Sequence, residues 1–204
     1  MIGVIDYGAG NLRSMFNAIT KVGREVGVEV FVTSSLEVLS SSQKIILPGV
    51  GAFGDVMENL KKMNIDSFVK DWIKKGKPFM GVCVGLQVLF EVGYENGTYE
   101  GLGIFKGEVI KFQKARPIPH IGWNQVKVVK ESPFFSSKDD GKYFYFVHSY
   151  YAKPKDDKIV NTFTEYDGES FVSSVYFENI FAVQFHPEKS HKNGEEVLGN
   201  FLSL

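Results

Sequence analysis

The sequence predicts an α/β fold, a three-layer sandwich in which a central, mostly parallel sheet lies between helices and continues into an antiparallel β extension. Up to about residue 92, short apolar runs alternate with helical patterns, an order that indicates parallel strands joined by right-handed crossovers. After Tyr94, strand patterns follow one another directly and are separated by turn signals such as Asp139-Asp140-Gly141, so hairpins are expected. No linker long enough to divide the 204 residues is present, and we expect residues 1–204 to form a single domain.

Apolar runs in the first half of the chain predict four strands: Ile2 to Ile5, Val28 to Val32, Ile45 to Leu47 and Pro78 to Val82. A helix is expected behind Asn11, a favourable N-cap, and a short polar helix is expected after Ser34. A longer amphipathic helix should end at Gly76, ahead of Pro78. The apolar residues that predict its buried face are Ile65, Phe68, Val69, Trp72 and Ile73.

The second half of the chain has patterns typical of strands. The predicted strands are Glu108 to Phe112, Gln125 to Val129, Tyr143 to Tyr151, Ile159 to Thr164, Phe171 to Phe177 and Ile180 to Phe185. Glu195 to Leu202 should close the chain as a helix.

Composition excludes several classes of protein. Twenty-three basic and 24 acidic side chains nearly cancel, so nothing indicates a partner that requires clustered positive charge, such as nucleic acid or an acidic membrane surface. No apolar run approaches the roughly 20 residues of a membrane span. The single cysteine cannot form an internal disulfide and suits a reducing compartment. We therefore expect a soluble, cytoplasmic protein.

The only cysteine lies in the stretch Gly81-Val82-Cys83-Val84-Gly85-Leu86-Gln87. A short buried strand precedes it, and Leu86, Leu89 and Phe90 follow at helical spacing. Glycines two residues before and two after Cys83 permit a tight strand-to-helix turn, the layout of a nucleophile elbow. The amino end of the helix would favour a thiolate, and the Val84 N–H would face a developing oxyanion. The alternative is a buried core cysteine, which the flanking glycines alone do not exclude.

Two other glycine-containing loops also join strands to helices. Pro48 to Gly54 contains three glycines in six residues, so its N–H groups are open to a substrate or an oxyanion, unless the loop is simply a flexible turn. Asp6 to Asn11 contains a Gly-x-Gly but lacks the third glycine of the dinucleotide fingerprint, and we interpret it as a plain turn.

A cysteine nucleophile needs a base and a group that orients the base. His186 directly follows an apolar strand, and Glu188 comes two residues later, so an imidazole and a carboxylate are expected together at a strand end. His148 is expected to be packed in a strand, His191 to be exposed, and His120 to lie in a loop. No cluster has convincing zinc spacing, so neither a metal nor another cofactor is expected.

Several motifs resemble those of class I glutamine amidotransferases: Gly81 to Gln87, Pro48 to Gly54, and Gln184-Phe185-His186-Pro187-Glu188-Lys189-Ser190. Within that family, the stretches Asp6 to Asn11, Pro119 to Asn124 and Tyr145 to Tyr150 are similar to the glutaminase subunits of imidazole glycerol phosphate synthases. The resemblance covers nearly the whole chain and implies a flavodoxin-like sheet. Val84 and Leu86 stand where leucine and methionine are commoner in the family.

By this resemblance, Cys83 is the nucleophile that attacks the side-chain amide of glutamine, His186 is the base and then the acid, and Glu188 fixes the imidazole. The oxyanion donors are Val84 and the Val50-Gly51 loop, and we expect the orientation of the Val50 peptide to control activity. The remaining substrate contacts that the resemblance implies are Gln87, Glu95, His148, Ser149 and Tyr150.

The resemblance also implies a heterodimer with a (β/α)8-barrel cyclase subunit, which receives the ammonia and forms imidazole glycerol phosphate and an aminoimidazole carboxamide ribotide in histidine biosynthesis. Asn11, Trp123 and Lys189 are expected near the partner, unless they are ordinary surface. One alternative is a paralogous glutaminase that supplies another synthase, such as one that amidates a surface sugar. The other is a non-catalytic or esterase-like cysteine protein of the same fold.

Overall fold

The computed structural model describes residues 1–8 and 12–204. Within these residues an eight-stranded sheet runs through the molecule in the order β2-β1-β3-β4-β14-β13-β12-β9. Its parallel strands are β1 (Ile2–Ile5), β2 (Val30–Thr33), β3 (Lys44–Leu47), β4 (Phe79–Val82) and β14 (Ile180–Val183). Its antiparallel strands are β13 (Glu169–Phe177), β12 (Val160–Tyr166) and β9 (Lys127–Val128).

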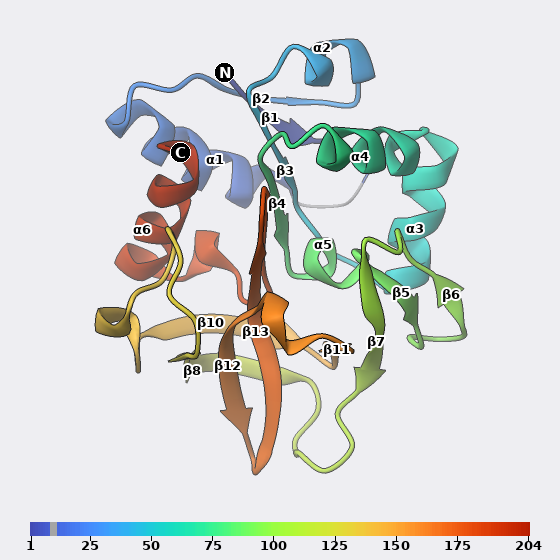
Figure 1. The fold of residues 1–204 in the computed structure, drawn as a ribbon, viewed down its shortest axis with the longest axis vertical. Helices are drawn as coiled ribbons and strands as arrows, with labels where there is room; N and C mark the ends of the chain where they lie inside the picture. The colour runs from blue at the N-terminus through green and yellow to red at the C-terminus, as the bar shows by residue number, and fades with distance from the viewer. Residues whose placement is uncertain (9–11) are drawn as a thin grey trace.

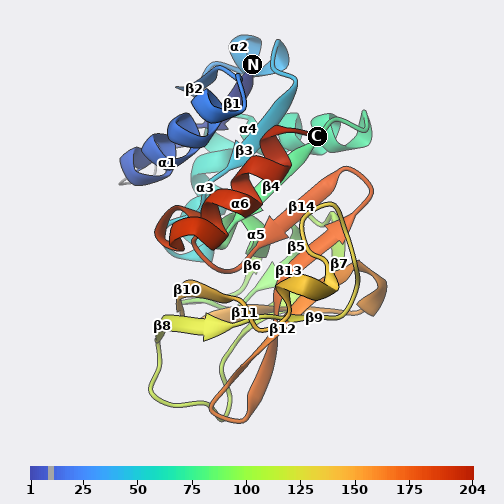
Figure 2. The same ribbon diagram turned by 90° about the vertical axis from the view of Figure 1, so that its left-hand side faces the viewer.

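Helices cover both faces of the parallel part of this sheet (Figures 1 and 2). On one face lie α1 (Leu12–Glu25) and α6 (His191–Leu202), and on the other lie α3 (Phe53–Lys62) and α4 (Ile65–Lys74). The remaining helices are short: α2 (Leu36–Ser40), α5 (Val84–Gln87), and 3-10 turns at Ser137–Asp139, Asp157–Ile159 and Pro187–Lys189. The predicted three-layer α/β architecture is thus confirmed. None of the helices in the described part of the chain has the length and apolar character that crossing a membrane requires.

Two smaller sheets form the predicted β extension, and all their strand pairs are antiparallel except one. One pairs β10 (Tyr143–His148) with β8 (His120–Gln125). The other has the order β11-β7-β5-β6, and its strands are Tyr150–Pro154, Phe105–Lys111, Phe90–Gly93 and Tyr99–Glu100. Its β5 and β7 run parallel. In Figure 1 both lie below the parallel strands, at the end of the sheet where β4 leads into α5.

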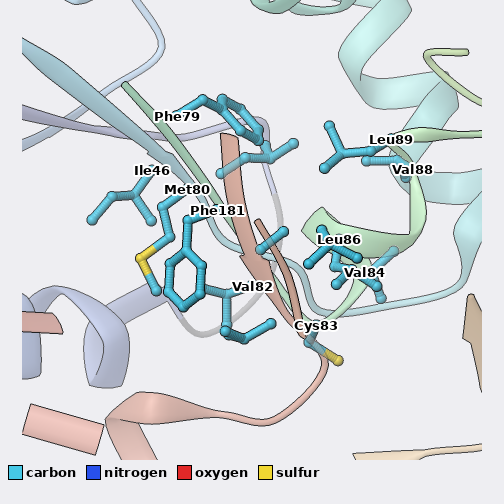
Figure 3. Packing of buried hydrophobic residues seen from close by; sticks show 14 of the residues in the cluster. Ile46, Phe79, Met80, Val82, Cys83, Val84, Leu86, Val88, Leu89 and Phe181 are labelled. Carbon is cyan, nitrogen blue, oxygen red and sulfur yellow. The ribbon is translucent and has the colours of Figure 1, made fainter. Parts of the chain in front are cut away.

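The parallel strands β1, β3, β4 and β14 are buried on both faces, as expected for strands between two helical layers, whereas β2 at the edge of the sheet is only partly buried. Figure 3 shows the packing around β4, where Met80 and Val82 lie beside Phe181 of β14. Cys83 lies at the rim of this cluster, and its sulfur points away from Met80 and Phe181 (Figure 3). Cys83 therefore lies at the boundary of the hydrophobic core.

The helix predicted through Phe90 is wrong beyond Gln87. Helix α5 has a single turn, and Phe90 begins β5. The backbone that follows α5 is held by a distant segment: Leu102 N–H donates to Val88 O at 2.7 Å, and Ile104 N–H donates to Leu89 O at 2.9 Å. These long-range hydrogen bonds override the local helical spacing of the apolar residues.

Two expectations in the extension are also wrong. His120 lies in a strand and not in a loop, and it is opposite His148 across the β8–β10 pair. The alternation along β8 is inverted, because Ile121 and Trp123 are 59% and 45% exposed while His120 is buried, so the pattern did not predict a strand. The single strand predicted over Tyr143 to Tyr151 divides at Ser149, where the chain passes from β8 as its partner to β7.

Helix α3 and strand β6 were not predicted as separate elements, and the other elements differ from the prediction mainly at their ends. The second strand begins at Val30 and not at Val28, and the strand predicted over Gln125 to Val129 is only Lys127–Val128. The last helix begins at His191, earlier than predicted. The expected N-cap, Asn11, lies outside the described residues.

Candidate active site

Cys83 occupies a sharp turn between β4 and α5. Its backbone has φ 54° and ψ −110°, a conformation that L-residues rarely adopt and that is typically retained at functional sites. The turn is held on both sides: Cys83 N–H donates to Val183 O at 2.7 Å, and Cys83 O accepts Leu86 N–H at 3.0 Å. The elbow geometry predicted from the flanking glycines is present.

The neighbouring glycines permit close backbone packing at this elbow. A Cβ on Gly85 would collide with the Leu47 carbonyl oxygen at the end of β3, and one on Gly81 would collide with the Gly85 carbonyl oxygen. A Cβ on Gly49 would meet the backbone nitrogens of Val84 and Gly85. The loop after β3 therefore lies directly against the amino end of α5.

His186 reaches this site because β14 pairs in parallel with β4. The register places Val183 beside Val82, so the residues after both strands emerge together. The His186 N–H donates to Tyr145 O at 2.8 Å, and the ring Nδ1 lies 2.8 Å from Glu188 Oε1. Because Nδ1 is occupied by Glu188, Nε2 is the ring nitrogen left for other contacts.

The electrostatics of His186 are those of a paired imidazole. Burial lowers its pKa, but the charge of Cys83 and hydrogen bonds with Cys83 and Glu188 outweigh burial and raise the pKa to about 10. Glu188 Oε1 carries the bond to the ring, while its other oxygen is buried without a partner among the described residues. The raised pKa favours the imidazolium form of His186.

A cavity of about 320 Å³ opens over the sulfur, within the range of small-ligand sites. All eight residues expected to contact substrate line it: Val50, Gly51, Val84, Gln87, Glu95, His148, Ser149 and Tyr150. Cys83, His186 and Lys189 also line it, together with Gly49, Pro119 and Val147, which were not individually predicted as site residues. Glu188 lies behind His186, outside the lining.

Comparison with known proteins identifies the family. The model of the family described as "Glutamine amidotransferase class-I" matches residues 3–203. The chain belongs to the class I glutamine amidotransferase family.

Within this family, the chain is similar to relatives that bear one particular subunit name. The chain is 52% identical to "Imidazole glycerol phosphate synthase subunit HisH" of Aquifex aeolicus, over 97% of this chain and 94% of that protein. It is 48% identical to the protein of the same name from Pyrococcus furiosus, over 100% of this chain and 98% of the relative. Among solved structures, PurLQS from Thermotoga maritima has a TM-score of 0.74 at 20% identity, covering 98% of this chain and 96% of that one, which shows the fold.

Val50, the expected oxyanion donor, is engaged elsewhere in this amidotransferase. Its N–H donates to the hydroxyl of Tyr7 at 3.4 Å. Tyr7 is buried, and burial raises its pKa to about 12, so the hydroxyl keeps its proton. Val84 is the first residue of α5, where an N–H has no intrahelical acceptor.

Glu95 links the cavity to the loop before α3. Its Oε2 accepts the Phe53 N–H at 2.9 Å, and Phe53 is the first residue of α3. A carboxylate at this end of a helix is favoured by the helix dipole. Glu95 therefore fixes the end of the Pro48 to Gly54 loop while it lines the cavity.

Of the expected partner-facing residues, Lys189 lines the cavity and Trp123 packs against Tyr145. The Trp123 ring stacks parallel to His191, at 5.2 Å between centroids, and Lys189 Nζ lies 5.8 Å from the centre of the Tyr145 ring. Trp123 and His191 are both exposed. Asn11 lies outside the described residues.

Buried histidines form a chain that the sequence did not reveal. His148 Nδ1 lies 2.8 Å from Tyr150 O, His148 Nε2 lies 3.0 Å from His120 Nδ1, and Asn124 Nδ2 lies 3.3 Å from His120 Nε2. With both rings neutral, each donates from Nδ1 and accepts at Nε2, which satisfies every contact. Burial lowers the pKa of His120 to about 4 and that of His148 to about 3, which keeps them neutral.

The substitution His120→Phe should reduce the acid sensitivity of the fold. Because the folded pKa of His120 lies below its ordinary value of 6.5, its contribution to stability is full above pH 6.5 and is lost as the pH falls toward about 4. The urea midpoint of the wild type should therefore drop between about pH 7.5 and about pH 5, and it should drop less in the variant. Equal drops in both proteins would contradict this assignment.

No role was predicted for two polar residues that lie beside Cys83 and His186. Ser190 Oγ donates to His186 O at 2.6 Å and accepts Tyr145 N–H at 3.0 Å, which fixes the backbone of the histidine. Gln184 is fully buried next to Cys83. Its position two residues before His186 was a usable signal, because alternate residues of an extended segment project to one face. Among residues 1–8 and 12–204, no group of three His, Cys, Asp or Glu side chains could hold a metal ion.

Proposed function

We propose that this chain is the glutaminase subunit of an imidazole glycerol phosphate synthase, with Cys83, His186 and Glu188 as its catalytic triad. The observation that carries the proposal is the convergence of an elbow cysteine and a carboxylate-bound imidazole on one cavity. The relatives that bear this subunit name match over nearly their whole length and support the choice of pathway. We further propose that residues 1–204 act as one domain and that the protein is cytoplasmic, since its one cysteine is a free thiol.

In the first half-reaction, the Cys83 thiolate attacks the side-chain amide carbon of glutamine. The carbonyl electron pair moves to oxygen, and its return expels the amino group. His186 gives that group its proton, so ammonia leaves and a thioester remains on Cys83. Glu188 stabilises the imidazolium and keeps Nε2 directed at the sulfur.

In the second half-reaction, His186 takes a proton from water, and the hydroxide attacks the thioester carbon. Collapse of the tetrahedral adduct breaks the carbon–sulfur bond and gives the Cys83 thiolate and a carboxylic acid, which loses its proton to solvent as glutamate; the proton on His186 stays there or passes to the sulfur. No cofactor is needed for either step, because the bonds broken are acyl bonds.

Substrate binding follows from the lining of the cavity. The Val84 N–H and an N–H of the Val50-Gly51 loop receive the oxyanion, and Val50 must leave Tyr7 before it can contribute. The Ser149 and Tyr150 backbone and His148 line the cavity, and in this proposal they bind the α-carboxylate, while Glu95 offers a carboxylate for the α-ammonium. Gln87 forms part of the wall beneath the substrate.

The partner in this proposal is a (β/α)8-barrel cyclase subunit that receives the ammonia. Trp123 and Lys189 would contact it, and they are adjacent to Tyr145 at the edge of the site. Asn11 is proposed as a third contact. Lys189 and Val50 line the same cavity, so a partner bound at Lys189 would be close enough to change the orientation of the Val50 peptide.

The test is a titration of the purified chain with such a cyclase while glutamate release is measured. We expect a 1:1 complex and a rise in glutamate formation that depends on the cyclase and on its bound ligand. Cys83→Ala is the control, and it should form the complex without releasing glutamate above background. A complex that forms but never hydrolyses glutamine would overturn the proposal. Stimulation by a different synthase alone would replace the histidine-pathway assignment with the paralogous one.

A further inference from the structure

Gln184 contacts the reactive sulfur directly. It follows the last residue of β14, in register with Cys83 after β4, and it is fully buried. Its Nε2 donates to Cys83 Sγ at 3.6 Å. An amide donor at this position is one of the few polar groups that reach the sulfur from within the fold.

We propose that Gln184 is a catalytic residue whose side-chain N–H stabilises the Cys83 thiolate, and that Gln87 is a positioning residue that fixes its orientation. The inference rests on the proposed function only in taking Cys83 as the nucleophile. It adds to the triad a donor that acts on the sulfur before substrate arrives.

The orientation of the Gln184 amide is set by its other end. Gln184 Oε1 accepts an N–H from Gln87 Nε2 at 3.0 Å. Rotating the amide by half a turn would lose this bond and place the carbonyl oxygen against the sulfur, where it would repel a thiolate. The amide is therefore held with its donor side toward Cys83.

Gln87 is itself held by the backbone of β11. Its Nε2 also donates to Tyr150 O at 2.9 Å, so Gln87 uses its amide nitrogen on the protein. The same carbonyl lies 2.8 Å from His148 Nδ1. A continuous set of hydrogen bonds thus runs from the histidine chain through Tyr150, Gln87 and Gln184 to the sulfur.

The energetic reason is the difference between the two forms of the sulfur. An anionic sulfur is a stronger acceptor than a thiol, so an N–H fixed on it favours ionisation. Ionisable groups around the sulfur also act on it, and all of them remain when Gln184 is changed. They are His186 with Glu188 behind it, Tyr7, and the cavity residues Glu95, His148 and Lys189.

The experiment follows the alkylation of the full chain by iodoacetamide as a function of pH. Cys83 is the only cysteine, so alkylation occurs at this one thiol, and the alkylation rate measures the fraction of Cys83 that is thiolate. In Gln184→Met the acid limb of the profile should move up by about one pH unit, which makes alkylation on that limb about tenfold slower. A variant whose limb coincides with that of the wild type would overturn the proposal.

Two further variants separate this role from a structural one. Phe185→Leu alters the adjacent buried residue, which stacks on Phe144, and should lower the melting temperature while the limb stays in place. Gln87→Met removes the group that orients Gln184, and should move the limb in the same direction by a smaller amount. If Gln184→Met does not fold, the test rests on Gln87→Met. An acid limb that stays at the wild-type pH in that variant rejects the proposal.

The measurement needs neither glutamine nor a partner subunit. A profile that responds to Gln184 in a chain that releases no glutamate would retain this inference and reject the proposed function. If the chain hydrolyses glutamine but neither Gln184→Met nor Gln87→Met moves the pH profile of alkylation, the proposed function is retained and this inference is rejected.

Discussion

Glutamine hydrolysis by the assembled complex should fall about 10⁴-fold in kcat when Glu188 is replaced by glutamine, by analogy with the loss of the carboxylate in other triads. Glu188 Oε1 binds His186 Nδ1 at 2.8 Å, and it is the acceptor that fixes the tautomer and stabilises the imidazolium. A glutamine can present its N–H to Nδ1 instead, which would place the ring proton on Nε2, where it faces the sulfur. The imidazole could then no longer act as the base for the thiol.

Glutamate release at saturating glutamine, measured in the presence of the cyclase, tests this effect. The substitution leaves the exposed surface almost unchanged because the Glu188 side chain is only 6% exposed, so the complex should still form. Glu178→Gln is a matched control, since Glu178 is an exposed residue in the turn before β14 and far along the strand from the site. Turnover within a few-fold of the wild type in the Glu188 variant would exclude Glu188 from the triad.

Gly85→Ala should destabilise the fold by about 3 kcal/mol or more, the upper range for forced overpacking. The added Cβ would collide with the Leu47 carbonyl oxygen, a backbone atom at the end of a buried central strand. Neither side can move without shifting β3 or the elbow. The expected result is a large fall in the urea midpoint, or no folded protein.

Gly199→Ala supplies the matched comparison for this prediction. Gly199 lies within α6, and its nearest contact for an added Cβ is Val22 Cγ1 at 3.6 Å, an ordinary distance. Alanine should stabilise the helix there by roughly 1 kcal/mol, through helix propensity. Equal stability of the two alanine variants would show that the elbow tolerates a side chain, contrary to the packing described above.

The outline of the site could be predicted because its parts are local motifs. The glycines around Cys83 and the His186 to Glu188 spacing each indicate geometry within a few residues, and the resemblance to the family supplied the remaining contacts. All the substrate residues expected in this way line one cavity. Element positions were recoverable where a strand or helix follows its own periodicity, as in β4 and α4.

Residues whose roles depend on distant partners could not be predicted in the same way. His120 looked like a loop residue because its neighbours Ile121 and Trp123 are exposed apolar residues, and only pairing with β10 defines the strand. Phe90 looked helical until hydrogen bonds from residues 102 and 104 to Val88 and Leu89 are considered. Gln184 stood in a recognised motif, but its contact with the Cys83 sulfur depends on the pairing of β14 with β4 and was not predicted.

The sequence by itself determined the alternation of strands and helices in the parallel part of the sheet, the elbow at Cys83 and the imidazole with its carboxylate, since each depends on backbone preferences over a few neighbouring residues. Tertiary structure alone decided which segments meet at the sulfur. The parallel register of β4 and β14 brings Gln184 to Cys83 across 101 residues of chain and His186 to the same cavity, and the contact of Tyr7 with the Val50 loop engages the Val50 N–H. Such contacts follow from the global pairing of strands, which local patterns do not encode.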